Sequence, residues 1–264
     1  MVTGARGMLG SALLPCLGGE HSTTGVDRQD FDITCAAAVD KACHELRPEF
    51  VYHLAAYTDV DGCERDPAKA YQFNVLGSRN LARACAETGA TLLYVGTDYV
   101  FDWRLDRPYR GDDSPRAQSV YGHSKLQGEQ YVRALVSKHF IVRTSWLCGQ
   151  RGKNFVATIL KLASGRGDLR VVNDQRGSPP YTRHLTSQLV RFLGWKSFGV
   201  FHVTGTGECS WFDFGQAIVR AAGCPNMRVT SITSRELGRP AKRPANSVLE
   251  NRRLAECKMG SLTH

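Results

Sequence analysis

Three glycines near the start of the chain limit its fold more than any other feature. Val2 and Thr3 lead into a G-x-x-G-x-x-G pattern made by Gly4, Gly7 and Gly10. This pattern is typical of the turn between the first strand and the first helix of a dinucleotide-binding fold. There the first glycine permits a tight turn, the second lets backbone N–H groups approach a pyrophosphate, and the third lets the helix pack on the strand. We therefore expect a strand, a phosphate-binding loop and a helix.

A carboxylate follows at about the distance that this motif requires. Asp27 lies 17 residues after Gly10, at the end of the next apolar run, where an acidic side chain can bind the ribose hydroxyls of the cofactor. Arg28 leaves the choice of cofactor open, because Asp27 favours NAD whereas an adjacent arginine can accept the 2′-phosphate of NADP. NADH or NADPH is therefore expected. Pro15 conflicts with this scheme, since it falls inside the expected helix, where proline costs about 3 kcal/mol unless the helix bends.

Short apolar runs alternate with longer helix-like stretches over the first two-thirds of the chain. The runs lie at residues 24–26, 50–54, 91–95 and 140–142. This order is typical of repeated βαβ units, so the expected fold is α/β, with a doubly wound parallel sheet of the Rossmann type. We expect a dinucleotide-binding domain over residues 1–150. Residues 151–264 are expected to form mainly a smaller C-terminal substrate-binding lobe, from which segments can return to the sheet.

Composition argues against several other classes of protein. The net charge of the 264 residues is +9, but the basic residues are spread out and not interleaved with aromatic ones, so nucleic acid is not an expected partner. No apolar stretch approaches the ~20 residues that span a bilayer, and the early glycine loop leaves no room for a signal peptide. The nine cysteines are scattered and include no C-x-x-C pair. They are expected to be reduced thiols in a cytoplasmic protein.

Tyr121 and Lys125 are the candidate catalytic pair. On the helix expected over residues 119–135 they stand at positions i and i+4, so both side chains project from one face. A nearby ammonium is expected to lower the pKa of the tyrosine, which suits proton exchange with a carbonyl. Thr97 ends an apolar run, and ligands bind at the carboxyl ends of such strands. Its hydroxyl is therefore expected to hydrogen-bond the carbonyl oxygen of a substrate.

Further motifs resemble those of the dTDP-4-dehydrorhamnose reductases, a family of extended short-chain dehydrogenases/reductases. They lie at residues 55–61, 97–102, 121–129, 143–146, 152–155, 174–179 and 239–244, so the resemblance extends over nearly the whole chain. It implies NAD(P)H-dependent reduction of the C4 ketone of dTDP-4-dehydro-6-deoxy-L-mannose to dTDP-L-rhamnose, a precursor of bacterial surface polysaccharides. Trp103 departs from the family pattern, because it replaces a glycine that usually follows the Phe-Asp pair at 101–102.

The resemblance also implies which residues form the site. Together with the glycine loop, the cofactor-binding residues would be Gly4, Gly7, Met8, Leu9, Gly10, Asp27, Arg28, Asp32, Ile33, Ala55, Ala56, Tyr57, Thr58, Tyr121 and Lys125. The sugar of the dTDP-sugar substrate would be held by Thr97, Asp98, Tyr99 and Trp146. Aromatic rings suit this task because a flat ring can stack on the face of a pyranose.

Two other functions fit part of the pattern. A non-catalytic dinucleotide-binding subunit, like the regulatory subunit of methionine adenosyltransferase, shares the expected fold. A sister sugar-nucleotide enzyme, an epimerase or a dehydratase, also shares it. The related dehydratases place Asp-Glu after the strand-end threonine, whereas here Asp98 is followed by Tyr99. The resemblance is compatible with a homodimer and with Mg²⁺ at a dimer contact. No carboxylate cluster can be assigned to that ion, so no metal ligand is predicted.

Overall fold

The central sheet is parallel and doubly wound, as the alternation of apolar runs predicts. The structure is a computed structural model that describes residues 1–19, 21–163, 167–224 and 227–260. Within these residues six strands pair in the order β2-β1-β3-β4-β5-β8, and every pair is parallel. Their bounds are β1 Val2–Thr3, β2 Gly25–Val26, β3 Phe50–His53, β4 Thr91–Thr97, β5 His139–Thr144 and β8 Gly199–His202.

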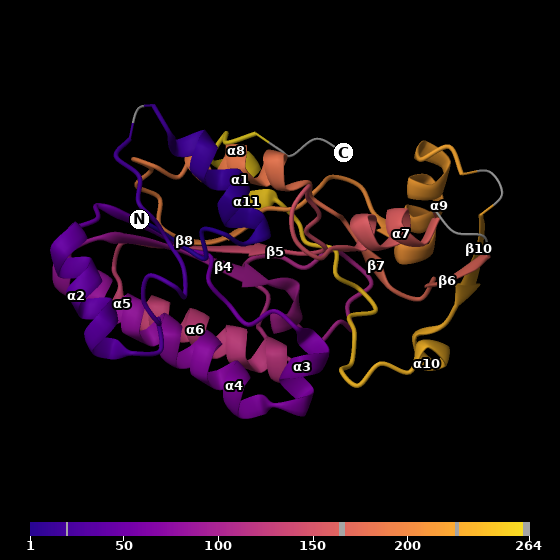
Figure 1. The fold of residues 1–264 in the computed structure, drawn as a ribbon, viewed down its shortest axis with the longest axis horizontal. Helices are drawn as coiled ribbons and strands as arrows, with labels where there is room; N and C mark the ends of the chain where they lie inside the picture. The colour runs from indigo at the N-terminus through magenta and orange to yellow at the C-terminus, as the bar shows by residue number, and fades with distance from the viewer. Residues whose placement is uncertain (20, 164–166, 225–226, 261–264) are drawn as a thin grey trace.

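Helices cover both faces of this sheet (Figure 1). One face carries α1 Met8–Leu17, α8 Thr182–Val190 and α11 Arg252–Glu256. The other carries α2 Ala36–Leu46, α3 Val60–Arg65, α4 Pro67–Tyr71, the π-helix η1 Gln72–Gly77, α5 Ser78–Thr88 and α6 Val120–Leu135. Because successive strand residues point to opposite faces, Val51 packs with Leu81 on one side and Tyr52 packs with Leu13 on the other. Two apolar cores therefore hold the sheet in place.

Residues beyond 150 divide between the sheet and a separate lobe. Strand β8 and helices α8 and α11 belong to the layers just described. The lobe consists of α7 Phe155–Ala163, β6 Asp168–Val172, α9 Trp211–Ala221 and β10 Arg228–Ile232, which lie apart from the sheet in Figure 1. It has its own core, in which Ile159, Leu169 and Ile218 are buried. The other short elements are η2 Asp98–Val100, which follows β4, and β7 Arg176–Gly177, β9 Cys209–Ser210 and α10 Ser234–Leu237.

Pro15 does not end the first helix. It lies inside α1, and the helix continues to Leu17. Pro15 is exposed and stands in the last turn, so the hydrogen bond that it removes lies at the end of the helix. In the described part of the chain, no helix is both long and apolar enough to cross a membrane.

Candidate active site

A single cavity of about 1560 Å³ contains every residue that the sequence assigns to the site. It lies at the carboxyl ends of the strands, where β1, β3, β4 and β5 face the lobe. The predicted residues that line it are Gly4, Gly7, Met8, Leu9, Gly10, Asp27, Arg28, Asp32, Ile33, Ala55, Ala56, Tyr57, Thr58, Thr97, Asp98, Tyr99, Tyr121, Lys125 and Trp146. Gly4 and Trp146, which are 142 residues apart in the sequence, thus line the same cavity.

The glycine loop forms a cradle that larger residues could not form. Gly4 has a φ of 69°, and a Cβ added to it would lie 2.8 Å from the backbone nitrogen of Ala55. A Cβ on Gly10 would overlap the carbonyl oxygen of Gly4. Gly7 caps α1 without a side-chain hydrogen bond, so the first N–H groups of the helix stay available to an anion. This geometry fits the pyrophosphate of a dinucleotide.

Asp27 is held by the backbone on both sides. Its Oδ2 accepts a hydrogen bond from the N–H of Arg6 at 2.9 Å, and its Oδ1 accepts one from the N–H of Arg28 at 2.8 Å. Each carboxylate oxygen keeps a second lone pair that can accept from a ribose hydroxyl. The guanidinium of Arg28 lies over the ring of Phe73, 5.5 Å from its centre. The residues present therefore fit the adenosine half of NAD(P)H.

Asn74 holds the loop that follows β3, a role that the sequence did not reveal. Its side chain accepts a hydrogen bond from the N–H of Tyr57 at 2.8 Å and donates to the carbonyl of Tyr57 at 3.0 Å. It also donates to the hydroxyl of Ser124 on α6. Asn74 lies in the π-helix η1, a distortion that often occurs at functional sites. The signal that could have indicated this role was that Asn74 is a polar residue on an otherwise apolar helical stripe.

Tyr121 and Lys125 project into the cavity from the first turns of α6. Ser119 caps this helix by accepting a hydrogen bond from the N–H of Gly122 at 3.1 Å. The ring of Tyr121 meets the ring of Tyr99 edge-on at 5.2 Å. The Nζ of Lys125 lies 4.1 Å from the centre of the Tyr94 ring. Among the described residues, no hydrogen bond or ion pair is made by this Nζ. Its charge is therefore poorly compensated within the chain.

Burial is the largest influence on the pKa values of both Tyr121 and Lys125. Burial raises the pKa of Tyr121, and hydrogen bonding to Thr97 offsets this only in part. The predicted lowering of the tyrosine pKa by Lys125 is therefore wrong for this structure. Burial also lowers the pKa of Lys125 to about 7, against the opposing effect of Glu129. Tyr121 accordingly stays protonated at neutral pH, which is the form that can donate a proton to a carbonyl.

Replacing Lys125 with methionine is expected to stabilise the fold while it removes catalysis. The folded pKa of about 7 lies below the ordinary lysine pKa of 10.5, so between these pH values the unfolded chain binds more protons. The stability that wild type owes to this group therefore rises with pH across that window. Lys125→Met should raise the free energy of unfolding by about 2–4 kcal/mol at pH 7, and by less at pH 9.5. Urea unfolding of both proteins at both pH values checks this. A loss of stability, or a gain that does not depend on pH, would contradict it.

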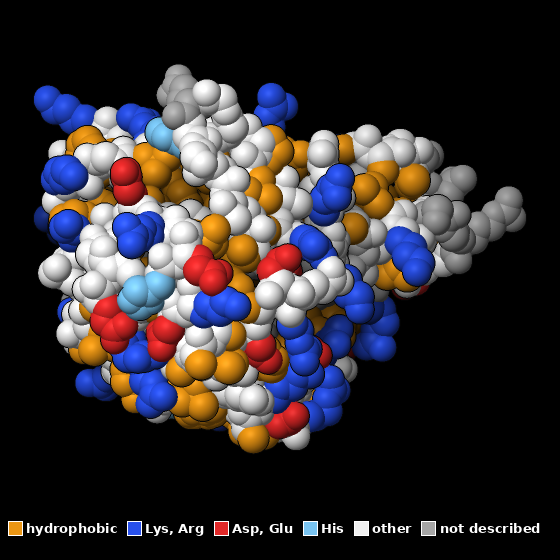
Figure 2. Space-filling view, turned by 60° about the vertical axis from the view of Figure 1, so that its left-hand side comes forward, with side chains coloured by type: hydrophobic (Ala, Val, Ile, Leu, Met, Phe, Trp, Pro, Cys, Tyr) orange, Lys and Arg blue, Asp and Glu red, His pale blue; other side chains and the backbone are white. Residues whose placement is uncertain are grey.

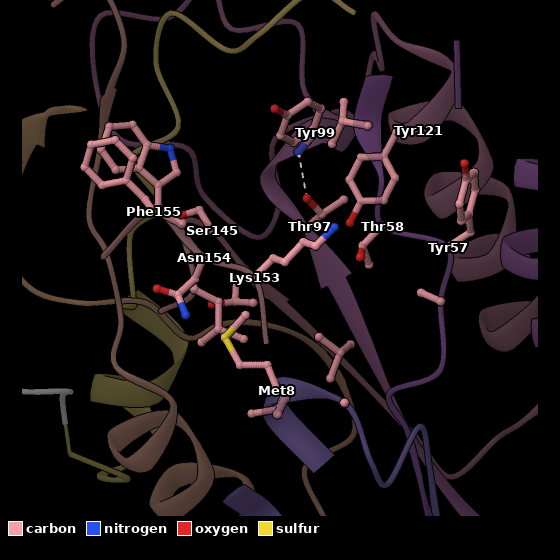
Figure 3. A pocket seen from close by; sticks show the side chains of 18 of the residues that line it. Met8, Tyr57, Thr58, Thr97, Tyr99, Tyr121, Ser145, Lys153, Asn154 and Phe155 are labelled. Carbon is pink, nitrogen blue, oxygen red and sulfur yellow. Dashed lines mark hydrogen bonds between the residues drawn. The ribbon is translucent and has the colours of Figure 1, made fainter. Parts of the chain in front are cut away.

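Thr97 and Asp98 form a buried pair at the end of β4. The hydroxyl of Thr97 donates to Oδ1 of Asp98 at 3.0 Å. It accepts from the N–H of Tyr99 at 3.2 Å, the dashed line in Figure 3. The hydroxyl of Ser247 donates to the other oxygen of Asp98. Burial raises the pKa of Asp98 to about 6. Each carboxylate oxygen of Asp98 accepts one hydrogen bond, so Asp98 orients the hydroxyl of Thr97. Asp98 also lines the cavity, and its contact with the sugar stays a prediction. For Thr97 to polarise a carbonyl, its hydroxyl has to rotate away from Asp98.

Trp146 does not present an open ring face to the cavity. Its indole stacks on Trp211, with ring centres 3.5 Å apart and planes 8° from parallel. A Cβ on Gly177 would overlap the ring-fusion atoms of Trp146, so the backbone of Gly177 covers the opposite face. The expected stacking of Trp146 on a pyranose is therefore replaced by stacking on Trp211. Phe155 extends this aromatic cluster, with its ring centre 4.5 Å from that of Trp211.

Trp103 adopts a backbone conformation that favours glycine. Its φ is 63°, in the left-handed region, where a side chain other than glycine is strained. The departure from the family pattern noted in the sequence therefore stands at a position where a glycine would relieve strain. The ring of Trp103 lies edge-on to Tyr99, with their centres 5.8 Å apart. Trp103 thereby packs against a residue of the cavity wall.

The wall opposite Thr97 and Tyr121 comes from residues that the sequence did not assign. In Figure 3 Lys153, Asn154 and Phe155 lie across the cavity from Tyr121, and Lys153 points toward its centre. The motif at 152–155 was part of the resemblance, but nothing in its pattern indicated a role. Within the described ranges 1–19, 21–163, 167–224 and 227–260, no group of three His, Cys, Asp or Glu could hold a metal ion.

Comparison with known proteins agrees with this geometry. The family model for the RmlD substrate binding domain matches residues 1–264. A dTDP-4-dehydrorhamnose reductase of Streptomyces griseus is 40% identical to the chain, and the match covers 100% of the chain and 89% of the relative. The chain belongs to the dTDP-4-dehydrorhamnose reductase family. A spore coat polysaccharide biosynthesis protein of Bacillus subtilis is 37% identical, with 97% of the chain and 90% of that protein covered.

A solved structure of this family has nearly the same backbone. The dTDP-4-dehydrorhamnose reductase of Bacillus anthracis, solved in complex with NADP, superposes with a TM-score of 0.97 at 38% sequence identity. The match covers 99% of the chain and 93% of the B. anthracis chain. The family resemblance that the sequence motifs indicated is thereby confirmed, as is the Rossmann-like fold.

Proposed function

We propose that this protein reduces the C4 ketone of dTDP-4-dehydro-6-deoxy-L-mannose to dTDP-L-rhamnose with NAD(P)H. One observation carries this proposal. A single cavity brings the glycine cradle and Asp27 together with Thr97, Tyr121 and Lys125. The first group suits a dinucleotide, and the second suits proton transfer to a carbonyl. The names of its relatives support the choice of a nucleotide-linked sugar as the substrate.

The chain supplies the proton and the charge stabilisation for this reduction. When bound, the nicotinamide ring supplies the hydride that reaches C4 of the sugar. The Tyr121 hydroxyl donates its proton to the ketone oxygen, which becomes the hydroxyl of the product. Burial keeps that proton on Tyr121 until a stronger base develops at the ketone oxygen. The Lys125 side chain, on the same face of α6, would stabilise the phenolate that remains and would help to hold the ribose next to the nicotinamide.

Consumption of NAD(P)H tests the proposal. The purified protein is mixed with NADH or NADPH and with the 4-keto sugar nucleotide, made by the upstream enzymes. The nicotinamide absorbance is expected to fall, and one dTDP-L-rhamnose should form for each cofactor oxidised. The same assay without the sugar nucleotide is the control. A protein that binds the dinucleotide but turns over neither cofactor would be a binding subunit. A protein that converts the sugar without net cofactor consumption would be an epimerase.

The residues around Asp27 support the use of both cofactors. Asp27 retains acceptor capacity for the ribose hydroxyls, whereas Arg6 and Arg28 both flank it with positive charge that suits a 2′-phosphate. The nine cysteines are free thiols. This supports a reducing compartment, the cytoplasm, as the place where the enzyme works.

A further inference from the structure

One buried tyrosine of the sheet contacts Lys125 at both its backbone and its ammonium group. Tyr94 stands on β4, and the Nζ of Lys125 lies over the face of its ring, 4.1 Å from the ring centre. The hydroxyl of Tyr94 donates a hydrogen bond to the backbone carbonyl of Lys125 at 2.9 Å. The ring face and the hydroxyl of one residue thus contact the two ends of Lys125.

The position of the Tyr94 ring is itself fixed by its neighbours. Tyr94 is completely buried, and its strand is paired on both sides, with His53 of β3 and Ile141 of β5 as its partners. Gly128 on α6 makes room for the Tyr94 hydroxyl, because a Cβ on Gly128 would lie 2.8 Å from the hydroxyl oxygen. A ring that is held at both ends can set the position of an ammonium group that lies over it.

The surroundings of Lys125 make the ring face important for its charge. On the face shown in Figure 2, Lys and Arg side chains are exposed and stand among Asp and Glu side chains. Lys125 is only 4% exposed, so water stabilises its charge far less. The negative face of an aromatic ring attracts a cation, and this attraction is stronger where water is removed. Tyr94 therefore supplies part of the stabilisation that water gives to a surface lysine.

The titratable neighbours of Lys125 give its charge limited support. Glu129, one turn further along α6, acts to raise the pKa of Lys125, but it is also paired with Arg143 of β5. His53 of β3 has both ring nitrogens hydrogen-bonded, and burial and the charge of Lys125 lower its pKa to about 3. Tyr121, one turn before Lys125, stays protonated at neutral pH because burial raises its pKa. At neutral pH Glu129 is therefore the neighbour whose charge favours protonated Lys125, and Arg143 shares that charge.

We propose that Tyr94 is a positioning residue for the catalytic lysine, and that its ring face holds the Lys125 ammonium at the cavity and stabilises its charged form. The consequence for catalysis rests on the proposed function, in which charged Lys125 stabilises the phenolate of Tyr121. Tyr94 lies outside the cavity lining, whereas Lys125 is part of it. Tyr94 thus acts on the reaction through Lys125 and not by contact with the substrate.

An NMR titration of Lys125 tests the role of the ring without any turnover. The protein is labelled with carbon-13 lysine, and the Cε resonance of Lys125 is identified by its absence from Lys125→Met. Tyr94→Phe keeps the ring face, so the pKa of Lys125 should stay close to its wild-type value. A trifluorinated phenylalanine at position 94 keeps the shape of the ring but withdraws electrons from its face. It should lower the pKa of Lys125 by about one pH unit relative to Tyr94→Phe. Equal pKa values with and without fluorine would overturn the proposal.

The pH dependence of turnover shows whether this charge matters to the reaction. Tyr94→Leu removes the ring, and a Lys125 pKa that falls from about 7 to about 6 leaves roughly a tenth of the lysine charged at pH 7 instead of about half. The kcat should therefore fall about fivefold at pH 7, and the loss should shrink below about twofold at roughly pH 5.5, where the lysine is mostly charged in both proteins. Tyr94→Phe should recover most of the lost kcat.

Tyr52→Leu is the matched control for the loss of a buried tyrosine. Tyr52 lies on β3, packs on the opposite face of the sheet from Tyr94, and donates a hydrogen bond to the carbonyl of Leu189. This variant should be less stable, but the pH dependence of its kcat should match wild type. A loss of kcat in Tyr94→Leu that is the same at every pH would overturn the proposal. A Lys125 pKa that responds to fluorine, in a protein that reduces no ketone, would retain the role of Tyr94 and overturn the proposed function.

Discussion

Tyr121→Phe is expected to lower kcat about 10³-fold, because it removes the one proton that the site directs to the ketone oxygen. The ring that meets Tyr99 edge-on at 5.2 Å is retained, so packing should change little. Tyr121 lines the part of the cavity next to Thr97 and not the glycine cradle, and the affinity for NADPH should therefore stay within a few-fold. Stopped-flow absorbance for turnover and fluorescence titration for cofactor binding measure the two effects separately.

Tyr131→Phe provides the matched control for this experiment. Tyr131 lies on the same helix, α6, but it is exposed and lies outside the cavity. The control should retain the full kcat. If Tyr121→Phe kept more than a tenth of the wild-type kcat, the proton would have to come from another group, and Tyr121 would lose its assigned role.

The second prediction concerns the stability that depends on a buried ion pair between the catalytic helix α6 and strand β5. Glu129 on α6 and Arg143 on β5 each have 1% of the side chain exposed, and Nε of Arg143 lies 3.1 Å from Oε2 of Glu129. Glu129→Leu should lower the free energy of unfolding by about 3–5 kcal/mol, because it leaves a buried guanidinium without its counter-charge. Guanidinium chloride unfolding measures this loss. The pKa of Lys125 should also fall further, since Glu129 acts to raise it.

The double variant Glu129→Leu/Arg143→Met distinguishes the cost of one unpaired buried charge from the effect of removing both charges. It should be much more stable than Glu129→Leu alone, because no unpaired charge remains inside. Nη1 of Arg143 finds no hydrogen-bond partner within the described residues, so the wild-type pair is not fully satisfied either. A double variant less stable than either single one would mean that apolar side chains cannot fill this space.

The local features of the site could be predicted because each depends on residues close together in the sequence. A glycine every third residue specifies the cradle between β1 and α1, and positions i and i+4 on a helix place Tyr121 and Lys125 on one face. Asp27 could be found from its distance after Gly10. The parallel sheet followed from the alternation of apolar runs with helical patterns. In each case the local feature follows from the geometry of residues close together in the sequence, and the rest of the chain only has to be compatible with it.

Only the tertiary structure decided the features that depend on distant partners or on burial. Stacking of Trp146 on Trp211 closes a ring face that the sequence left open for a sugar. The hydroxyl of Ser247 donates to the carboxylate of Asp98, although the two residues stand 149 positions apart. Such pairs leave no periodic signal, because the sequence separation of the partners has no relation to their distance in space. The pKa values of Tyr121 and Lys125 likewise follow from how completely the fold removes water around them. The sequence by itself thus determined the cradle and the catalytic pair, and packing decided which side chains still face the substrate and which carry a proton.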